Sequence, residues 1–345
     1  MGDCTTIYVL CPAYFKTGGT ELLHQLVYKL NGLGLHAQIA YTYAEDGKYL
    51  NPAFSEYVEQ YVLENDIVDN AKNILVIPEN CTHYIRRFSN IRIYLWWLSV
   101  DHYFKNYIQN PVKHFQVFWK ELGVTGELIN LIKHYIRGKY RRERSVLLKD
   151  MGRVSLHMVQ SQYAYHFLQE AGIKNVHYLS DYLNSAYLKK AQGVKTEGKQ
   201  NIVVYNPLKG KRFTDKVIKQ CCNIQFVPLQ GLTNSQVIEK LSQAKLYIDF
   251  GGHPGKDRFP REAAIMKCCV ITGRRGAAAY KDVLIDEEFK FQDKRENIPA
   301  IIHCMEEILE HYDEYIDRFA DYRNMIAAEE ERFDQDMREI FVNGK

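Results

Sequence analysis

The chain has almost no excess of charge of either sign. Its 345 residues include 45 Lys and Arg against 42 Asp and Glu, which leaves a net charge of +3. This balance, together with 46% hydrophobic residues, excludes an intrinsically disordered chain and gives no reason to expect nucleic acid as a partner. The chain also lacks a long apolar run and a basic segment before the first apolar one. We therefore expect neither a membrane span nor a secretory signal, but a cytoplasmic protein.

Cysteine spacings typical of zinc sites and redox motifs are missing as well. The chain has eight cysteines, and none of them forms a Cys-x-x-Cys motif. Two adjacent pairs, Cys221-Cys222 and Cys268-Cys269, lie in apolar, strand-like stretches. The pattern favours reduced, buried thiols and makes a zinc site improbable.

Two features bear on contact with a membrane. Residues 1–6 fit the loose N-myristoylation pattern, but a strand pattern already begins at Thr6, so we do not expect a lipid there. Residues 133–153 contain eight Lys and Arg but only two acidic residues, and they follow an apolar stretch. This segment fits an anionic membrane surface, at the inner face of the cell membrane, and a solvated helix on a domain rim equally well.

What the chain does contain is a regular alternation of strand and helix patterns. Such alternation predicts parallel sheets with helices on both faces, and the length favours two domains. A polar, glycine-bearing stretch at 191–200 reads as a linker between them. We predict an α/β fold with two doubly wound, Rossmann-like domains at 1–190 and 200–321, facing each other across a cleft. The expected strands are 6–11, 37–41, 74–77, 91–98, 157–160 and 176–179 in the first half, and 202–205, 224–227, 246–250 and 269–272 in the second.

Two loops at the expected cleft are suited to phosphate. Gly18 and Gly19 stand between the first strand and the first helix, where backbone N–H groups and the helix dipole favour an anion. The alternative there is a tight turn before a capped helix. Lys209, Lys211 and Arg212 follow the first strand of the second half, where three cations suit a pyrophosphate. The alternative is a basic surface loop.

The most informative stretch runs from Tyr247 through a glycine-rich, charged loop into a helix that begins near Pro260. Such a density of charged side chains between two core elements is costly unless the groups are paired or bind a ligand. Purely structural ion pairing is the alternative. A second small-residue loop, containing Gly276, opens into the same crevice. The ligand-binding candidates here are His253, Asp257, Arg258, Glu262 and Gly276.

Candidate catalytic residues lie in the first half. Asp101 and His102 follow the carboxyl end of the 91–98 strand, where either could accept a proton from a sugar hydroxyl. The alternative for Asp101 is the N-cap of the next helix.

These motifs together resemble the GT-B glycosyltransferases, specifically the glycosyltransferase 4-like group (glycosyl transferases group 1). The resemblance covers nearly the whole chain and is most specific from 202 to 291. The block from Asp249 to Glu262 is similar to a bacterial subgroup associated with surface polysaccharide assembly. The resemblance implies a nucleotide-sugar donor on the C-terminal domain and an acceptor on the N-terminal one. It also implies a final helix, at about 322–345, that packs back on the first domain.

The resemblance further implies roles for individual residues. Glu262 matches the second glutamate of the family's Glu-x7-Glu signature, which holds the donor ribose. Lys209 matches the lysine that neutralises the diphosphate. Gly18 and Gly19 resemble the glycines that approach the phosphate and the donor sugar, and Gly276 lies beyond the next strand as in the family.

Two positions depart from the family pattern. Pro254 stands where the first glutamate of the signature is expected, so a neighbouring side chain must make the sugar contact. The arginine that usually precedes the lysine is also missing. The replacements that we consider are His253 or Asp257 for the glutamate, and Lys211, Arg212 or Arg258 for the arginine.

We therefore expect a glycosyltransferase of the hexosyltransferase type. It would move a sugar from a nucleoside diphosphate sugar to a glycan or lipid-linked glycan in capsule, O-antigen or exopolysaccharide biosynthesis, and the resemblance alone implies retention of configuration. No cofactor is expected, and no metal ion, since we recognise no Asp-x-Asp motif in the chain. The alternatives are a GT-B-like nucleotide-sugar epimerase or glycan phosphorylase, and a glycan-binding protein with a decayed site.

Overall fold

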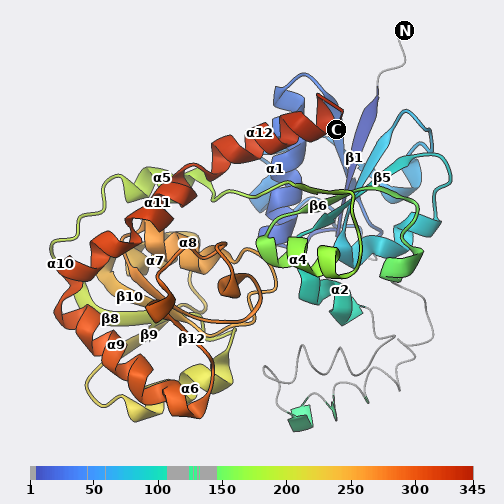
Figure 1. Cartoon of the computed structure of the whole chain (residues 1–345). Coiled ribbons are helices and arrows are strands. Elements are labelled where there is room, and N and C mark those ends of the chain that lie inside the picture. Colours follow the sequence, from blue (N-terminus) through green and yellow to red (C-terminus); the bar gives the residue numbers. More distant parts are fainter. Residues whose placement is uncertain are drawn as a thin grey trace.

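The computed structural model describes residues 5–44, 46–58, 60–106, 124–126, 128–129, 132 and 146–344. These residues form two units, each built on its own parallel sheet (Figure 1). We call them the first unit, with strands β1 to β7, and the second unit, with strands β8 to β12. The α/β class with parallel sheets that the sequence predicts is confirmed.

The sheet of the first unit has the strand order β3-β2-β1-β4-β5-β6-β7, and all neighbouring strands are parallel. Because parallel neighbours need long crossover connections, helices cover both faces. The three-residue strand β3 was not expected, because it is too short to show an alternating pattern. The strands are β1 (Thr6–Cys11), β2 (His36–Tyr41), β3 (Tyr61–Leu63), β4 (Ile74–Pro78), β5 (Arg92–Trp97), β6 (Val154–Val159) and β7 (Val176–Tyr178).

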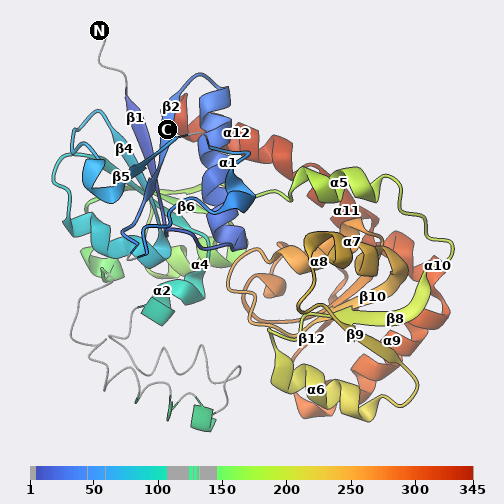
Figure 2. The same ribbon diagram turned by 180° about the vertical axis from the view of Figure 1, so that it is seen from behind.

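Alternate side chains of β1 supply the two hydrophobic cores of the first unit. Ile7 and Val9 pack against α1 and α12, which lie next to each other on one face (Figure 2). Tyr8 and Leu10 point to the opposite face and share a core with α2 and α4. The period of two residues along a strand accounts for this division. The helices are α1 (Gly18–Gly32), α2 (Val100–Asn106), α4 (Gln162–Glu170) and α12 (Glu329–Phe341).

The sheet of the second unit has the order β12-β11-β10-β8-β9 and is also parallel throughout. A single large core surrounds it. The strands are β8 (Gln200–Tyr205), β9 (Gln225–Pro228), β10 (Ala244–Asp249), β11 (Cys269–Gly273) and β12 (Lys290–Phe291). The helices are α5 (Ser185–Ala191), α6 (Lys211–Gln220), α7 (Asn234–Gln243), α8 (Arg258–Ile265), α9 (Ile298–Glu310), α10 (Tyr312–Tyr315) and α11 (Ala320–Ala327).

The chain passes between the units at positions that differ from the expected bounds. Tyr182 still packs in a core of the first unit, whereas Leu183 and Tyr187 belong to the core of the second. The first crossing is therefore near residue 182, and the polar stretch 191–200 is a surface loop between α5 and β8 rather than a linker. On the way back, Ile326 in α11 still packs in the second core, and Phe333 in α12 packs in the first. Burial of apolar side chains, not loop composition, fixes both crossings.

The cysteines fit the expectation only in part. Cys268 and Cys269 are buried at the start of β11, and no disulfide forms among the described cysteines. Cys221, however, ends α6, and Cys222 is exposed. The prediction of a buried strand for this pair was wrong, because the helix pattern from Lys211 continues up to it.

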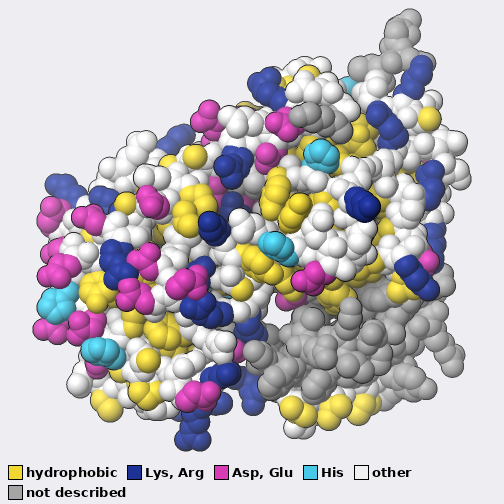
Figure 3. Space-filling model, viewed as in Figure 1, with side chains coloured by type: hydrophobic (Ala, Val, Ile, Leu, Met, Phe, Trp, Pro, Cys, Tyr) yellow, Lys and Arg dark blue, Asp and Glu magenta, His cyan; other side chains and the backbone are white. Residues whose placement is uncertain are grey.

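On the face seen in Figure 3, basic and acidic side chains are interspersed over the second unit, without a field of one sign. Among the described residues, no helix is long and apolar enough to cross a bilayer. Of the basic segment 133–153, residues 133–145 lie outside the described residues, as does Gly2. In the described remainder, Arg153 donates to the carbonyl oxygen of Phe88, at 3.2 Å.

Candidate active site

A cavity of about 360 Å³ lies between the two units. The carboxyl ends of parallel strands in both sheets reach it, which is where ligands of such sheets bind. From the first unit, its wall is formed by Pro12, Thr17, Gly18, Gly19, Thr20, Leu23, Pro78, Glu79, Asn80, Leu98, Ser99, His102, Gln160 and Asp181. From the second unit, the wall is formed by Asn206, Lys209, Asp249, Pro254, Gly255, Lys256, Asp257, Arg258 and Phe259.

The N-terminus of α1 forms one side of the cavity. Gly18 and Gly19, which were expected in a loop before the helix, are its first two residues, and both line the wall. Thr17 caps the helix by accepting a hydrogen bond from the N–H group of Thr20, at 3.2 Å. The capped turn and the cavity wall are thus the same structure, and the positive end of the helix dipole faces the cavity.

Lys209 and Asp257 meet on the opposite wall. The Lys209 ammonium lies 2.7 Å from the Asp257 carboxylate, whose other oxygen lies 3.2 Å from Nδ1 of His253. Burial alone would raise the pKa of Asp257, but Lys209 and His253 hold that pKa well below its usual range. Burial would likewise lower the pKa of His253, but Asp249 and Asp257 raise it. The two carboxylates therefore favour the protonated form of His253.

The side chain of His253 is fully buried and does not line the cavity. It was considered as a replacement sugar contact, and the structure places it behind Asp257 instead. Its backbone is left-handed, with φ of 46°, and its carbonyl oxygen accepts from the N–H group of Ala277 at 2.8 Å. A Cβ on Gly276 would lie 2.0 Å from that oxygen, so Gly276 is needed for packing on this loop. Gly276 itself does not line the cavity.

Asp249, His253 and Asp257 could hold a metal ion, since one ligand atom from each lies within 4.8 Å of the others. Competing partners already occupy them: Tyr247 donates to Asp249 at 2.7 Å, and Lys209 donates to Asp257. A protonated His253 can pair with the carboxylates of Asp249 and Asp257 while Tyr247 and Lys209 keep their own contacts with them. An Asp-x-Asp pair does occur, at Asp334 and Asp336 on α12, but Asp334 pairs with Lys29 and Asp336 accepts from the N–H group of Ser180.

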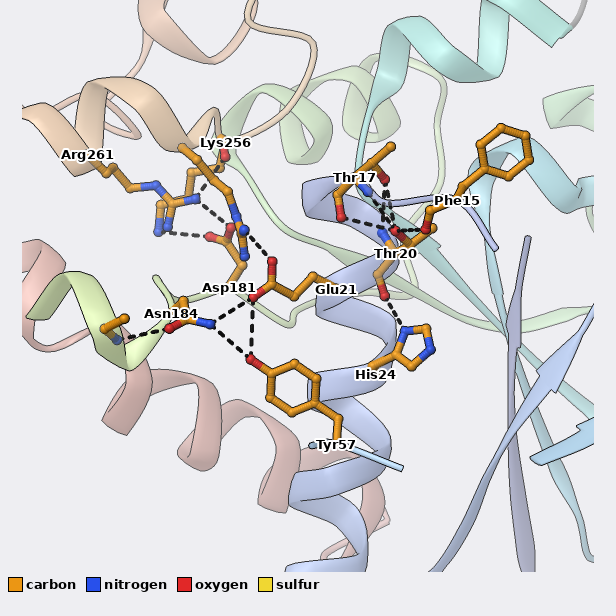
Figure 4. Close-up of polar contacts among 12 residues, drawn as sticks. Phe15, Thr17, Thr20, Glu21, His24, Tyr57, Asp181, Asn184, Lys256 and Arg261 are labelled. Carbon is orange, nitrogen blue, oxygen red and sulfur yellow. Dashed lines mark hydrogen bonds and ion pairs between the residues drawn. The ribbon is translucent and has the colours of Figure 1, made fainter. Parts of the chain in front are cut away.

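Arg258 connects the two units at the cavity. It is the first residue of α8, and its guanidinium lies 2.6 Å from the carboxylate of Glu21 in α1. Figure 4 shows that Glu21 also accepts hydrogen bonds from Tyr57 and from Asn184. Burial would raise the pKa of Glu21, but Arg258 and these donors lower it. Glu21 therefore stays ionised and fixes the position of Arg258.

Glu262 lies one turn further along α8 and is buried. It does not line the cavity; a hydrogen bond joins its side chain to Tyr187, and Arg258 and Arg261 lie nearby. Burial raises the pKa of Glu262 to about 7. The structure thus brings Glu262 next to Arg258 but not to the cavity wall.

Of the two catalytic candidates, only His102 lines the cavity. Asp101 accepts a hydrogen bond from the hydroxyl group of Tyr163 at 3.1 Å and lies outside the wall. Asp101 does not cap α2 through the contacts seen here either, because Ser99 Oγ accepts from the N–H group of His102 at 3.3 Å. Lys211 and Arg212 are exposed on α6, and Lys211 pairs with Asp215 at 2.8 Å.

Sequence reasoning missed several residues of the wall. Glu79 and Asn80 follow β4 directly, and Asp181 and Lys256 contribute charge from opposite units. The signal for Glu79 and Asn80 was available, because polar residues after a buried strand stand at the carboxyl end of the sheet. Asp181 gave the same signal, because it follows the expected strand 176–179, but only the tertiary structure brings it to α8.

A buried ion network holds the units together beside the cavity. Arg261 contacts Asp181 at 2.5 Å (Figure 4). Arg261 also contacts Glu329 at 2.7 Å, and Lys256 contacts Glu329 at 2.7 Å. Asp181 and Glu329 stand next to the two points where the chain crosses between the units. Close backbone contact adds to this, because a Cβ on Gly255 would lie 2.0 Å from the carbonyl oxygen of Leu98.

No protein-family model and no curated protein matches the chain. Solved structures do match it, and the three described next match over nearly their full length. A glycosyltransferase from Rickettsia africae is 13% identical with a TM-score of 0.59, and covers 99% of this chain and 100% of its own. HepE from Anabaena, solved with UDP-glucose, is 11% identical with a TM-score of 0.60, covering 98% and 99%. Sucrose-phosphate synthase from Thermosynechococcus elongatus is 11% identical with a TM-score of 0.61, covering 98% of each chain. The chain therefore has the fold of the GT-B glycosyltransferases.

Proposed function

We propose that the protein is a glycosyltransferase that uses a nucleoside diphosphate sugar as its donor. The observation that carries this proposal is the inter-unit cavity, which is lined both by Lys209 and Arg258 of the second unit and by the N-terminus of α1. Both ends of a diphosphate would meet positive charge there. The fold supports the proposal, as does the UDP-glucose bound to HepE from Anabaena, a protein of the same fold.

The cavity residues can stabilise the charge that grows on the leaving diphosphate. Asp257 orients Lys209, and Glu21 orients Arg258, so neither cation has to reorganise during transfer. This electrostatic contribution needs no metal ion, and we keep the expectation that none is required as part of the proposal. The bond from the anomeric carbon to the diphosphate breaks, and a new bond forms to an acceptor hydroxyl.

The finer assignments rest on the sequence resemblance. We propose a glycan or lipid-linked glycan as the acceptor, a role in bacterial surface polysaccharide assembly, and retention of anomeric configuration. The residues that we propose for the donor site are Gly18, Gly19, Lys209, Asp257 and Arg258, with His253 and Glu262 supporting them from behind the wall. His102 is the remaining candidate from the catalytic pair.

A nucleotide screen tests the proposal. Thermal unfolding of the full chain is measured with UDP, GDP, CMP and ADP at millimolar concentration, since a ligand that binds the folded state raises the melting temperature. We expect one nucleoside diphosphate to raise it, and Lys209→Met to abolish the rise. A wild-type protein that responds to none of the four would favour a decayed, glycan-binding site.

A second measurement separates the enzymatic alternatives. The matching nucleotide sugar is incubated with the protein without acceptor and without phosphate. A transferase gives only slow hydrolysis, whereas an epimerase converts the sugar to its epimer, and a phosphorylase acts only when phosphate is added. Conversion to an epimer would overturn the proposed function.

A further inference from the structure

The two walls of the cavity differ in charge. Among the described residues, every Lys and Arg that lines it comes from the second unit, namely Lys209, Lys256 and Arg258. The wall of the first unit has no such cation. It carries carboxyl and amide groups instead, including Glu79 and Asn80 at the carboxyl end of β4. Away from the N-terminus of α1, the described wall of the first unit therefore suits a neutral ligand group better than an anionic one.

Glu79 is a buried acid without a cationic partner among the described residues. Its side chain is 2% exposed, and Oε2 accepts a hydrogen bond from the N–H group of Leu98 at 2.9 Å. Burial raises the pKa of Glu79 to about 7, against the backbone N–H donors. Other carboxylates at the cavity have a cation beside them: Asp181 has Arg261, and Asp257 has Lys209. Glu79 can thus keep a proton and donate a hydrogen bond near neutral pH.

Asn80 provides an independent observation. Its Oδ1 atom is buried, yet it has no hydrogen-bond partner among the described residues. Buried polar atoms are normally satisfied, so an orphaned acceptor on a cavity wall points to a donor supplied by a ligand. Glu79 and Asn80 are adjacent in the sequence and follow one strand, so both lie at the same point of the wall.

We propose that Glu79 and Asn80 form the subsite that binds a hydroxyl group of a neutral sugar acceptor. A hydroxyl both donates and accepts: it donates to Asn80 Oδ1 and accepts the hydrogen bond of the protonated Glu79 carboxyl. A carboxylate or phosphate on the acceptor has no proton for Asn80 and finds no Lys or Arg on this described wall. The subsite therefore selects neutral sugars. This inference rests on the proposed function and adds the acceptor class to it.

The experiment measures sugar binding to the full chain saturated with the nucleotide found in the screen. The probes are the methyl glycosides of glucose, galactose and mannose, with methyl glucuronoside as the anionic probe, observed by saturation-transfer NMR. We expect at least one neutral glycoside to bind and the glucuronoside to give no signal. Asn80→Ala should lose at least tenfold in glycoside affinity, because the orphaned acceptor is gone.

The Asn80→Ala variant also distinguishes a loss of glycoside binding from a loss of folding. Because Asn80 Oδ1 has no hydrogen-bond partner in the part of the chain that the structure describes, its removal should leave the melting temperature and the nucleotide affinity unchanged. The Glu79→Gln variant should bind the glycoside with an affinity within about threefold of the wild type, because its amide can still donate a hydrogen bond. Such a change in affinity is smaller than the change expected from the loss of one hydrogen bond. Asn201→Ala, at the exposed amino end of β8, is the matched control.

The proposal is overturned if no neutral glycoside binds, if Asn80→Ala binds it like the wild type, or if the glucuronoside binds equally well. These results are distinct from a failure of the proposed function, in which the wild type binds no nucleotide in the first place.

Discussion

At the scale of single residues, ion pairs hold the cations of the cavity in place. Lys209 and Arg258 each face the cavity, and each is held by one carboxylate. Such pairing fixes the direction of a long, flexible side chain before a ligand arrives. The position of each cation therefore depends on its carboxylate partner as well as on its own side chain. Substituting the cation and the carboxylate separately should measure the two contributions to ligand binding.

Lys209→Met should weaken binding of the nucleoside diphosphate by at least tenfold, which is about 1.4 kcal/mol. The reason is the loss of a charge-assisted contact to phosphate, and the measurement is isothermal titration calorimetry. Lys211→Met is the matched control, because Lys211 lies two residues away, is exposed and pairs with Asp215. Equal losses in both variants would mean that the general charge of the loop, rather than Lys209, attracts the ligand.

The raised pKa of Glu79 predicts that the stability of the protein depends on pH. Its folded pKa of about 7 lies above the ordinary value of 4.5, so the folded protein keeps a proton that the unfolded chain releases. Its contribution to the free energy of unfolding therefore falls as pH rises from about 5 to 7, by on the order of 3 kcal/mol. Urea unfolding at pH 5 and pH 8 should show a smaller loss for Glu79→Gln than for the wild type.

Glu262 also has a pKa raised to about 7, and it remains in both proteins of that comparison. The informative quantity is thus the difference between the two pH profiles. Parallel profiles for the wild type and Glu79→Gln would contradict a proton on Glu79.

At the scale of elements, helix N-termini connect the units. Ser161 caps the N-terminus of α4, and Asp282 of the second unit adds a second acceptor there, because it accepts from the N–H group of Gln162 at 2.9 Å. The stacked rings of His166 and Tyr280, with centroids 5.0 Å apart, reinforce this contact. A helix cap here acts as a contact between two units.

Asp282→Ala should therefore destabilise the protein by about 1 kcal/mol, the usual cost of losing a helix cap. It should also raise the rate of amide hydrogen exchange at the start of α4. Asp286→Ala serves as the control, since Asp286 makes an exposed pair with Arg318. Unchanged exchange at Gln162 and Tyr163 would show that the cap does not hold the helix.

At the scale of the whole molecule, the ion network beside the two crossings fixes how the sheets face each other. Arg261 is fully buried and joins Asp181 to Glu329. Burial would lower the pKa of Arg261, but both carboxylates raise it, so it is ionised at all relevant pH values. Removing it leaves two buried carboxylates with only Lys256 between them.

Arg261→Met should cost about 3–5 kcal/mol in the free energy of unfolding, the range found when one partner of a buried ion pair is removed. Chemical denaturation measures this loss, and small-angle scattering shows whether the units move apart. Arg274→Met, which breaks a pair with the exposed Glu287, should cost less than about 1 kcal/mol. Similar losses of stability in the two variants would show that the buried network stabilises the protein no more than an exposed ion pair does.

Much of the fold followed from local pattern. The strand Thr6–Cys11 was expected from its apolar run and occurs there. The helix expected over 21–33 also occurs, but it begins at Gly18, because the two glycines form its first turn instead of a turn before it. The strand Tyr61–Leu63 was missed because three residues carry no measurable period. For the site, the loop after β10 was found by its density of charge, but the roles within it were not, since a sequence does not show which charges pair.

The sequence by itself determined the two parallel sheets and the loops at their carboxyl ends, because apolar periodicity acts between near neighbours. The tertiary structure alone decided where the units meet. Asp181 and Arg261 are 80 residues apart yet lie in contact, and His253 is drawn behind Asp257 instead of reaching the cavity. The almost neutral total charge thus conceals a cavity whose described Lys and Arg residues all come from the second unit, whereas the first unit contributes carboxyl and amide groups. Pairing between distant charges depends on burial, and only the folded chain defines burial.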